Sequence, residues 1–193
     1  MKKVLIMLLV FTLLLGMFSG CNNEILKNDT PKSYKFGATY MTLNNPFFVL
    51  LNNGIKDVVE ANGDTLIALD PALDPGKQIS QIEDLISQGV DAIFVTPADW
   101  KGIRPALEAA QKAGIPIINV DAPVYDTDLV ASIIASDNYN AGVICANDMM
   151  SKLNRAKIVI LVHPTAKSSI DRTQGFIDTI ADIDTIGRGT HLK

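Results

Sequence analysis

Apolar residues follow two spacings along this chain, short continuous runs and longer stretches with an apolar side chain every three or four positions. Four short runs predict buried strands, at 35–41, 65–69, 91–96 and 116–120. Three longer stretches between them predict amphipathic helices, at 46–62, 75–88 and 100–113. Strands and helices are therefore expected to alternate from residue 35 to residue 120.

The residues at the predicted helix ends support these boundaries. A glycine follows each helix, in the position that favours a left-handed backbone, namely Gly63, Gly89 and Gly114. A side chain able to cap the first turn precedes each helix, namely Asn45, Asp74 and Asp99. Repeated strand–helix–strand units with right-handed crossovers build a parallel sheet with helices on both faces. The predicted fold class is therefore α/β, with a doubly wound parallel sheet.

The same pattern begins again after residue 120. The predicted elements are, in order, an apolar run at 129–135, a helix from Ser136 to about Leu153, a strand at 157–162 and a helix near 169–180. We interpret 34–136 as a first lobe that lacks its returning segment, and 137–193 as the beginning of a second lobe. Because one such unit cannot bury both faces of a sheet, we expect an incomplete second lobe, as in a truncated or partial sequence.

Polar side chains follow the predicted strands. The segments after parallel strands meet at one edge of a sheet, where open α/β sheets bind ligands, and here they are 42–45, 70–74, 96–99 and Asp121. A carboxylate at Asp121 can accept hydrogen bonds from two adjacent hydroxyls, which suits a vicinal diol. The alternative is that Asp121 caps a neighbouring backbone turn.

The stretch TLNNPFF (42–48) joins the first strand to the first helix. It places the Asn45 amide and the rings of Phe47 and Phe48 beside a helix N-terminus with unpaired N–H groups. Two rings next to an amide suit a sugar, which has apolar faces and a rim of hydroxyls. The alternative is an ordinary capped helix with both rings in the core.

The N-terminus has the pattern of a secretory signal at 1–20, with Lys2 and Lys3 before an apolar segment. Small residues directly before Cys21 are similar to a bacterial lipobox, so we expect Cys21 to be lipidated and 21–33 to be a flexible tether. An ordinary signal peptide is the alternative. Either interpretation predicts export, to the membrane surface or the periplasm of a bacterium.

Composition narrows the function classes. The chain has 193 residues, of which 48% are apolar, and a net charge of −4, so no basic face suggests nucleic-acid binding. The sequence has no GxGxxG fingerprint, nucleophile elbow or metal-ligand cluster, and His163 and His191 are isolated. We therefore expect no enzyme activity, no catalytic residue, no metal and no cofactor. Cys145 is predicted to be a buried thiol without a disulfide partner.

These motifs together identify a family resemblance. The segments TLNNPFF (42–48), VTPAD (95–99), INVDAP (118–123), IASDNYNAG (134–142) and IDRTQGF (170–176) resemble type I periplasmic sugar-binding proteins of the ribose-binding class. That class is related to the ligand domain of LacI-type repressors. The resemblance covers about 34–181 and implies a receptor that holds a monosaccharide between two lobes and delivers it to the membrane subunits of an ABC permease.

The resemblance also implies roles for particular residues. In the first lobe, Asn45, Phe47, Phe48 and Thr96 would contact the sugar, and Asp121 would bind its diol. Ser136 would contact the ligand from the hinge side, and Arg172 would close over the ligand from the second lobe. The protein would be a monomer attached to the membrane only through its lipid. A receptor that presents ligand to a chemotaxis or sensor-kinase partner is the alternative, as is a truncated fragment that does not bind.

Two positions depart from the ribose-binding pattern. Thr96 stands where the family often has Asn, and Ala122 stands where ribose binders carry Arg after the diol-binding Asp. Losing a bidentate donor changes which hydroxyls are recognised. Another pentose, a hexose, an inositol or a furanose-type signal is therefore an open alternative to ribose.

Overall fold

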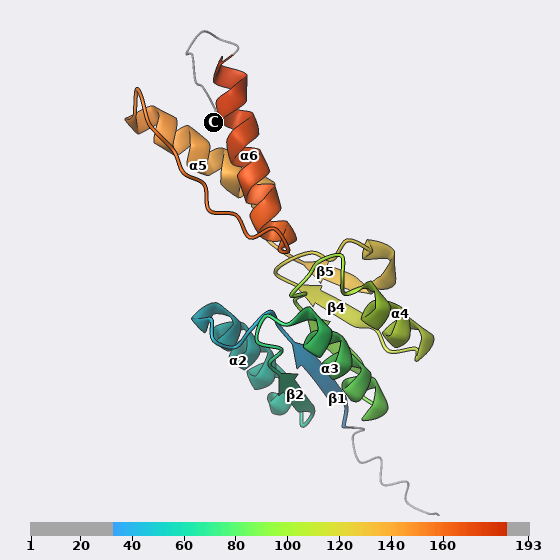
Figure 1. Cartoon of the computed structure of the whole chain (residues 1–193). Helices are drawn as coiled ribbons and strands as arrows, with labels where there is room; N and C mark the ends of the chain where they lie inside the picture. The colour runs from blue at the N-terminus through green and yellow to red at the C-terminus, as the bar shows by residue number, and fades with distance from the viewer. Residues whose placement is uncertain (1–32, 185–193) are drawn as a thin grey trace, which may run out of the picture. The chain divides into compact units, whose positions relative to one another are not determined.

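A parallel sheet lies at the centre of the described part of the chain. The computed structural model describes residues 33–184, which belong to one unit, Ser33–Lys193. The predicted signal peptide, Cys21, nearly all of the tether and residues 185–193 lie outside the described residues. The strands are β1 (Lys35–Thr39), β2 (Thr65–Leu69), β3 (Ala92–Val95), β4 (Ile117–Val120) and β5 (Ser132–Ile134). Their order, β2-β1-β3-β4-β5, and their parallel pairing confirm the predicted fold class (Figure 1).

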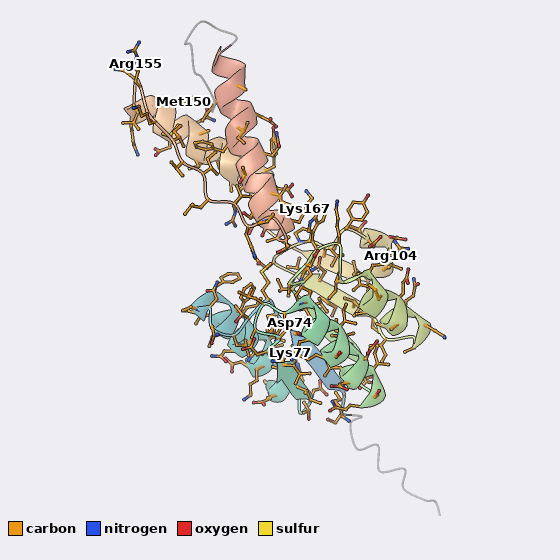
Figure 2. The ribbon with its side chains drawn as sticks, viewed as in Figure 1. Asp74, Lys77, Arg104, Met150, Arg155 and Lys167 are labelled. Carbon is orange, nitrogen blue, oxygen red and sulfur yellow. The ribbon has the colours of Figure 1, made fainter. Side chains whose placement is uncertain are left out.

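The connecting helices agree closely with the predicted ones, and are α2 (Pro46–Ala61), α3 (Pro75–Ser87) and α4 (Arg104–Lys112). Glycines with positive φ follow all three, with values of 80° at Gly63, 67° at Gly89 and 72° at Gly114. The predicted caps are confirmed at α2 and α3. In α3, the Asp74 carboxylate accepts a hydrogen bond from the Lys77 N–H at 3.0 Å (Figure 2).

The predicted cap at Asp99 is wrong. Asp99 Oδ1 instead accepts hydrogen bonds from the N–H groups of Lys101 and Gly102, at 2.9 and 3.0 Å. The carboxylate is satisfied by this separate turn, and α4 therefore begins later, with Ile103 at a cap position that has no side-chain hydrogen bond.

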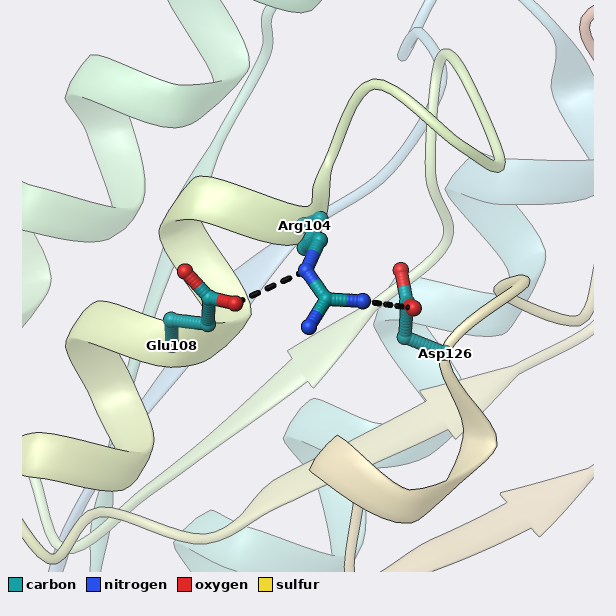
Figure 3. Close-up of polar contacts among 3 residues, drawn as sticks. All are labelled: Arg104, Glu108 and Asp126. Carbon is teal, nitrogen blue, oxygen red and sulfur yellow. Dashed lines mark hydrogen bonds and ion pairs between the residues drawn. The ribbon is translucent and has the colours of Figure 1, made fainter.

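The start of α4 is tied to the segment that follows β4. Arg104 donates a hydrogen bond to Glu108 at 2.7 Å on the same helix, and also pairs with the buried carboxylate of Asp126 (Figure 3). The hydrogen bond with Glu108 and the charge of Asp126 raise the pKa of Arg104 above its usual value. The 3-10 turn η2 (Thr127–Leu129) comes directly after this ion pair.

Two apolar clusters cover the two faces of the sheet. One joins α3 and α4 to the sheet through buried residues that include Ile82, Leu85, Ile93, Leu107 and Ile117. The other joins α2 to the opposite face through residues that include Ala38, Tyr40, Phe48 and Val120. Neighbouring strand residues fall in different clusters, as the two-residue period of a strand requires.

Two further helices, α5 (Asn138–Lys152) and α6 (Lys167–Asp184), pack against each other. The contact is close at two glycines. A Cβ atom at Gly142 would lie 2.0 Å from the Arg172 carbonyl oxygen, and one at Gly175 would lie 2.1 Å from that of Tyr139. Glycine is therefore required where the two helices cross. None of the helices in 33–184 is long and apolar enough to cross a membrane.

Two predictions on this part of the chain are wrong. Residues 157–162 form a coil and not a strand, because an apolar run becomes a strand only beside a hydrogen-bonding neighbour. Cys145 is exposed and not buried. The buried residues of α5 are four apart, at Asn138, Gly142 and Ala146, and Cys145 lies outside that stripe.

Candidate functional site

The carboxyl ends of β1, β3 and β4 present most of the residues that the sequence predicts at a ligand site. Asn45 caps α2, where its Oδ1 accepts a hydrogen bond from the Phe47 N–H at 3.0 Å. Its side-chain NH₂ group has no partner among residues 33–184. The cap thus fixes the amide at the edge and leaves two donors for a ligand.

The two phenylalanines that follow have different environments. Phe47 is 50% exposed, whereas Phe48 is 4% exposed and belongs to the core cluster under α2. Phe48 stacks on the buried ring of Tyr40, with centroids 6.1 Å apart, and meets Phe47 edge-to-face at 5.3 Å. Burial raises the pKa of Tyr40 to about 12. Each alternative from the sequence therefore describes one ring: Phe47 is available to a ligand, and Phe48 supports it from the core.

Asp121 follows β4 in an unusual conformation. Its φ is 66°, in the left-handed region that costs a residue with a side chain about 1–3 kcal/mol. The backbone N–H donates to the Ile134 carbonyl at 2.9 Å, and the side chain is half-buried. The carboxylate accepts no hydrogen bond from any described residue. Asp121 therefore does not cap a turn, and its acceptor atoms are uncommitted.

The charge of Arg172 acts on Asp121, although the two residues are 51 positions apart in sequence. Desolvation raises the pKa of Asp121, and the positive charge of Arg172 lowers it in part. Arg172 is exposed on α6, so its guanidinium retains donors for a further acceptor. Asp121 therefore offers an acceptor from the first predicted lobe, and Arg172 offers a donor from the second.

Thr96 and Ser136 lie in different environments. Thr96 is fully buried and its hydroxyl donates to the Val120 carbonyl at 2.9 Å. Its side chain therefore joins the ends of β3 and β4 below the edge. Ser136 is exposed, and its carbonyl accepts a hydrogen bond from Asn138 Nδ2 at 3.0 Å. Asn138 itself is buried, and its Oδ1 has no partner in the described part of the chain.

Two buried amides that the sequence interpretation missed organise the loops of the site. Gln78 donates to the carbonyls of Tyr40 and Thr96, at 3.2 and 2.9 Å, and accepts from the Ala98 N–H at 2.8 Å. Asn119 donates to the carbonyls of Val95 and Ala122 and accepts from the Val124 N–H. The available signal for Asn119 was a lone amide in an apolar strand, whereas Gln78 lies between Lys77 and Ile79 in a helix that also contains Gln81, and the sequence gives no comparable signal there.

Trp100 connects this edge to the segment before α6. Its backbone N–H donates to the Thr165 carbonyl at 3.1 Å, and its backbone carbonyl accepts from the Tyr125 N–H at 2.8 Å. The indole meets the Tyr125 ring edge-to-face at 5.3 Å, and the Nζ atoms of Lys101 and Lys167 lie 4.9 and 5.6 Å from its centroid. These contacts connect the loop after β3 to the segment that leads into α6.

Other kinds of site find less support. A cavity of about 320 Å³ lies beside the starts of β4 and β5, at the opposite edge of the sheet, and none of the predicted site residues lines it. The residues that the structure describes contain no group of three or more His, Cys, Asp or Glu side chains able to hold a metal ion.

Comparison with known proteins finds a matching family and similar proteins. Residues 36–191 match a family described as a periplasmic binding protein domain. The ribose import binding protein RbsB of Bacillus subtilis (strain 168) is 36% identical over 190 residues, which cover 94% of this chain and 61% of the relative. The galactofuranose-binding protein YtfQ of Escherichia coli (strain K12) is 30% identical over 139 residues, which cover 69% and 44%.

Solved structures show the same fold. An ABC transporter solute binding protein from Mycobacterium smegmatis with bound glycerol aligns with a TM-score of 0.72 and 31% identity, over 78% of this chain and 52% of that one. A galactofuranose binding protein aligns with a TM-score of 0.72 and 25% identity, over 77% and 52%. The chain therefore spans between 44% and 61% of the relatives and structures named here.

Proposed function

The chain belongs to the periplasmic binding protein domain family, and from this premise we propose that it is an extracytoplasmic receptor for a monosaccharide-type ligand. In this proposal, 34–136 is the first lobe, 137–193 opens the second, and the ligand lies between them. The receptor passes its ligand to an ABC sugar transporter. The named relatives are binding proteins, which agrees with the expectation that the chain is not an enzyme.

The observation that carries the proposal is the state of Asp121. A half-buried carboxylate that accepts no hydrogen bond from residues 33–184, on a residue held in a left-handed conformation, is costly unless something uses it. Two vicinal hydroxyls would supply the missing donors. Each would form a charge-assisted hydrogen bond, which is stronger than one between neutral groups.

The surrounding residues supply the other contacts that a sugar needs. The exposed ring of Phe47 offers an apolar face for the C–H groups of a pyranose or furanose ring. The Asn45 NH₂ group and the Arg172 guanidinium offer donors to hydroxyl oxygens. Phe48 and Thr96 act beneath this surface: Phe48 supports Phe47, and Thr96 holds the ends of two strands together.

The proposed ligand class is wider than ribose. Ala122 is buried directly after Asp121 and carries no donor, so the diol is held by fewer groups than an arginine there would provide. Two relatives are named for ribose and galactofuranose, and one solved structure contains bound glycerol. We propose a polyhydroxylated ligand of pentose, hexose or inositol size. Ser136 is assigned to the hinge, and Cys21 to a lipid anchor on the sequence pattern alone.

Sugar-dependent thermal stabilisation of the purified protein tests the proposal. A ligand at about 100 times its Kd stabilises the folded state by ~2.7 kcal/mol, so one member of a panel of pentoses, hexoses and inositols should raise the Tm. Asp121→Asn keeps the shape of the side chain and removes its charge, and it should abolish the shift. Asp128→Asn, which changes an exposed carboxylate at η2, should retain it. A shift that survives Asp121→Asn would refute the assignment.

A further inference from the structure

The segment after β4 makes a tight turn at Asp121. The Ala122 N–H donates a hydrogen bond to the Val120 carbonyl at 3.0 Å, across a single residue. Because that residue, Asp121, has a φ of 66°, the hydrogen bond closes a γ-turn of the rare, strained kind. The Asp121 carboxylate accepts no hydrogen bond from residues 33–184, so its own side chain does not hold the turn. The conformation is therefore imposed by neighbouring groups.

Asn119, two positions before Asp121, supplies several of these contacts. Its Nδ2 donates to the Ala122 carbonyl at 2.9 Å, and its Oδ1 accepts from the Val124 N–H at 3.0 Å. Nδ2 also donates to the Val95 carbonyl at 3.0 Å, which anchors the amide to the end of β3. One side chain thus ties the residues that follow Asp121 to the neighbouring strand of the sheet.

Burial makes these hydrogen bonds difficult to replace. Asn119 and Ala122 are fully buried, and Val124 is 2% exposed. Without the amide, the Ala122 carbonyl and the Val124 N–H would lose this partner inside the core, which is costly. An uncharged amide offers two N–H donors and an acceptor at one position. Asn119 therefore matches the three backbone groups to which it bonds.

The side of the turn that precedes Asp121 is held independently of Asn119. The Thr96 hydroxyl donates to the Val120 carbonyl at 2.9 Å, the same oxygen that closes the γ-turn. The Asp121 N–H donates to the Ile134 carbonyl of β5 at 2.9 Å. These bonds fix where β4 ends, but neither of them acts on the residues after Asp121. The course of the chain beyond the turn therefore depends on Asn119.

We propose that Asn119 is a positioning residue of the sugar site, which holds Asp121 in its strained conformation before a ligand arrives. The inference rests on the proposed function, in which the Asp121 carboxylate binds a diol. A loop that already has its binding conformation spares the ligand the free energy of arranging it. Without Asn119, the strain favours relaxation of Asp121 to a negative φ, and only the fraction of molecules that keeps the turn can bind. Strain of this kind corresponds to a factor of about 5 to 150 in population, and the affinity should fall by the same factor.

The conformation of Asp121 can be measured without any ligand. A residue with a positive φ gives a strong nuclear Overhauser effect between its own N–H and Hα protons, because they lie closer together than at negative φ. We expect this effect at Asp121 in NMR spectra of the full wild-type chain. It should be lost in Asn119→Leu, which has a side chain of similar size without hydrogen-bonding groups. Asn119→Thr keeps one hydroxyl, which can replace at most one of the two donated bonds, and it should weaken the effect.

Sugar affinity gives the second readout. Isothermal titration calorimetry of the full chain uses ribose, galactose and myo-inositol, one for each proposed size class. The Kd of the sugar that binds the wild type should rise about 5- to 150-fold in Asn119→Leu. Val59→Ala is the control for lost stability alone, because it shortens a 7% exposed side chain near the end of α2. It should lower the Tm and leave the Overhauser effect at Asp121 and the Kd unchanged.

The outcomes separate this proposal from the proposed function. An unchanged Overhauser effect at Asp121 in Asn119→Leu would overturn the positioning role, and so would an unchanged sugar affinity. If Asn119→Leu does not fold, the same two criteria apply to Asn119→Thr. If no sugar binds the wild-type chain, the proposed function fails, whereas the Overhauser effect still decides whether Asn119 holds Asp121 in its conformation.

Discussion

At the scale of single residues, Asp121 combines two features that lower stability. Its backbone is left-handed and its carboxylate is partly desolvated. Both features are expected at a ligand site, where strain is retained because it positions a functional group. The sequence could place Asp121 at the end of an apolar strand. It could not reveal the positive φ, which depends on how the following loop is held by Asn119.

The raised pKa of Asp121 predicts a pH-dependent penalty. Folding disfavours the ionised form, so the penalty is present at neutral pH and disappears as pH falls below the unfolded value of about 3.9. Asparagine removes the charge and tolerates the left-handed conformation. We expect Asp121→Asn to be more stable than the wild type at pH 7, with a difference that shrinks towards pH 4. Urea unfolding over this range measures it, and a variant less stable at pH 7 would contradict the prediction.

The neighbouring rings should respond differently to truncation. Phe48→Ala removes a buried side chain and should lower the free energy of unfolding by about 3–5 kcal/mol. Phe47→Ala removes a half-exposed ring, so it should cost much less stability and act mainly on sugar binding. Chemical denaturation measures the first effect and ligand-induced Tm shifts measure the second. Equal losses of stability in both variants would show that Phe47 also belongs to the core.

At the scale of elements, the packing of α5 on α6 depends on two glycines. Each allows the backbone of one helix to meet the backbone of the other, and neither contact leaves room for a methyl group. This packing holds Arg172, whose carbonyl lies against Gly142, in place on α6. The position of Arg172, whose charge acts on Asp121, is therefore set partly by a small residue on another helix.

Adding one methyl group at this crossing should separate the helices. In Gly142→Ala the new Cβ would lie 2.0 Å from a backbone oxygen, and backbone cannot rotate away as a side chain does. We expect a lower Tm and loss of any sugar response. Gly54→Ala is the matched control, since nothing lies within 4 Å of its Cβ, and it should stabilise α2 by roughly 0.5–1 kcal/mol. Circular dichroism melts of both variants decide the matter, and similar melts would count against the close packing.

The elements that the sequence predicted well are those whose stability is local in origin. The helices could be predicted from the apolar spacing and from the glycines that follow them, Gly63, Gly89 and Gly114. An apolar stripe, an N-cap and a C′ glycine all lie within one short segment of sequence, so each can be recognised without knowledge of the rest of the fold. The predicted strand at 157–162 was wrong because a strand needs a neighbouring strand to hydrogen-bond with, and composition does not say whether one is present. The cap at Asp99 was wrong because one carboxylate can serve either a turn or a helix.

At the scale of the whole molecule, topology explains why a site could be outlined from sequence. Parallel strands deliver their following loops to one edge, so Asn45 and Asp121 could be expected there before their contacts were known. The sequence did not predict which side chains at that edge would be exposed to a ligand and which would be buried. Thr96 and Phe48 turned inward because buried partners were available to them, a carbonyl in one case and an aromatic ring in the other.

The backbone hydrogen bond between Trp100 and Thr165 places an intrinsic fluorophore at the connection between the sheet and the segment before α6. Trp100 is the only tryptophan in the chain, so all indole fluorescence originates at the connection between the sheet and the segment leading into α6. Two lysine ammonium groups lie within 6 Å of the ring. A rearrangement that lengthens this connection would change the field and the hydration around the indole, and the emission spectrum would record it without any added label.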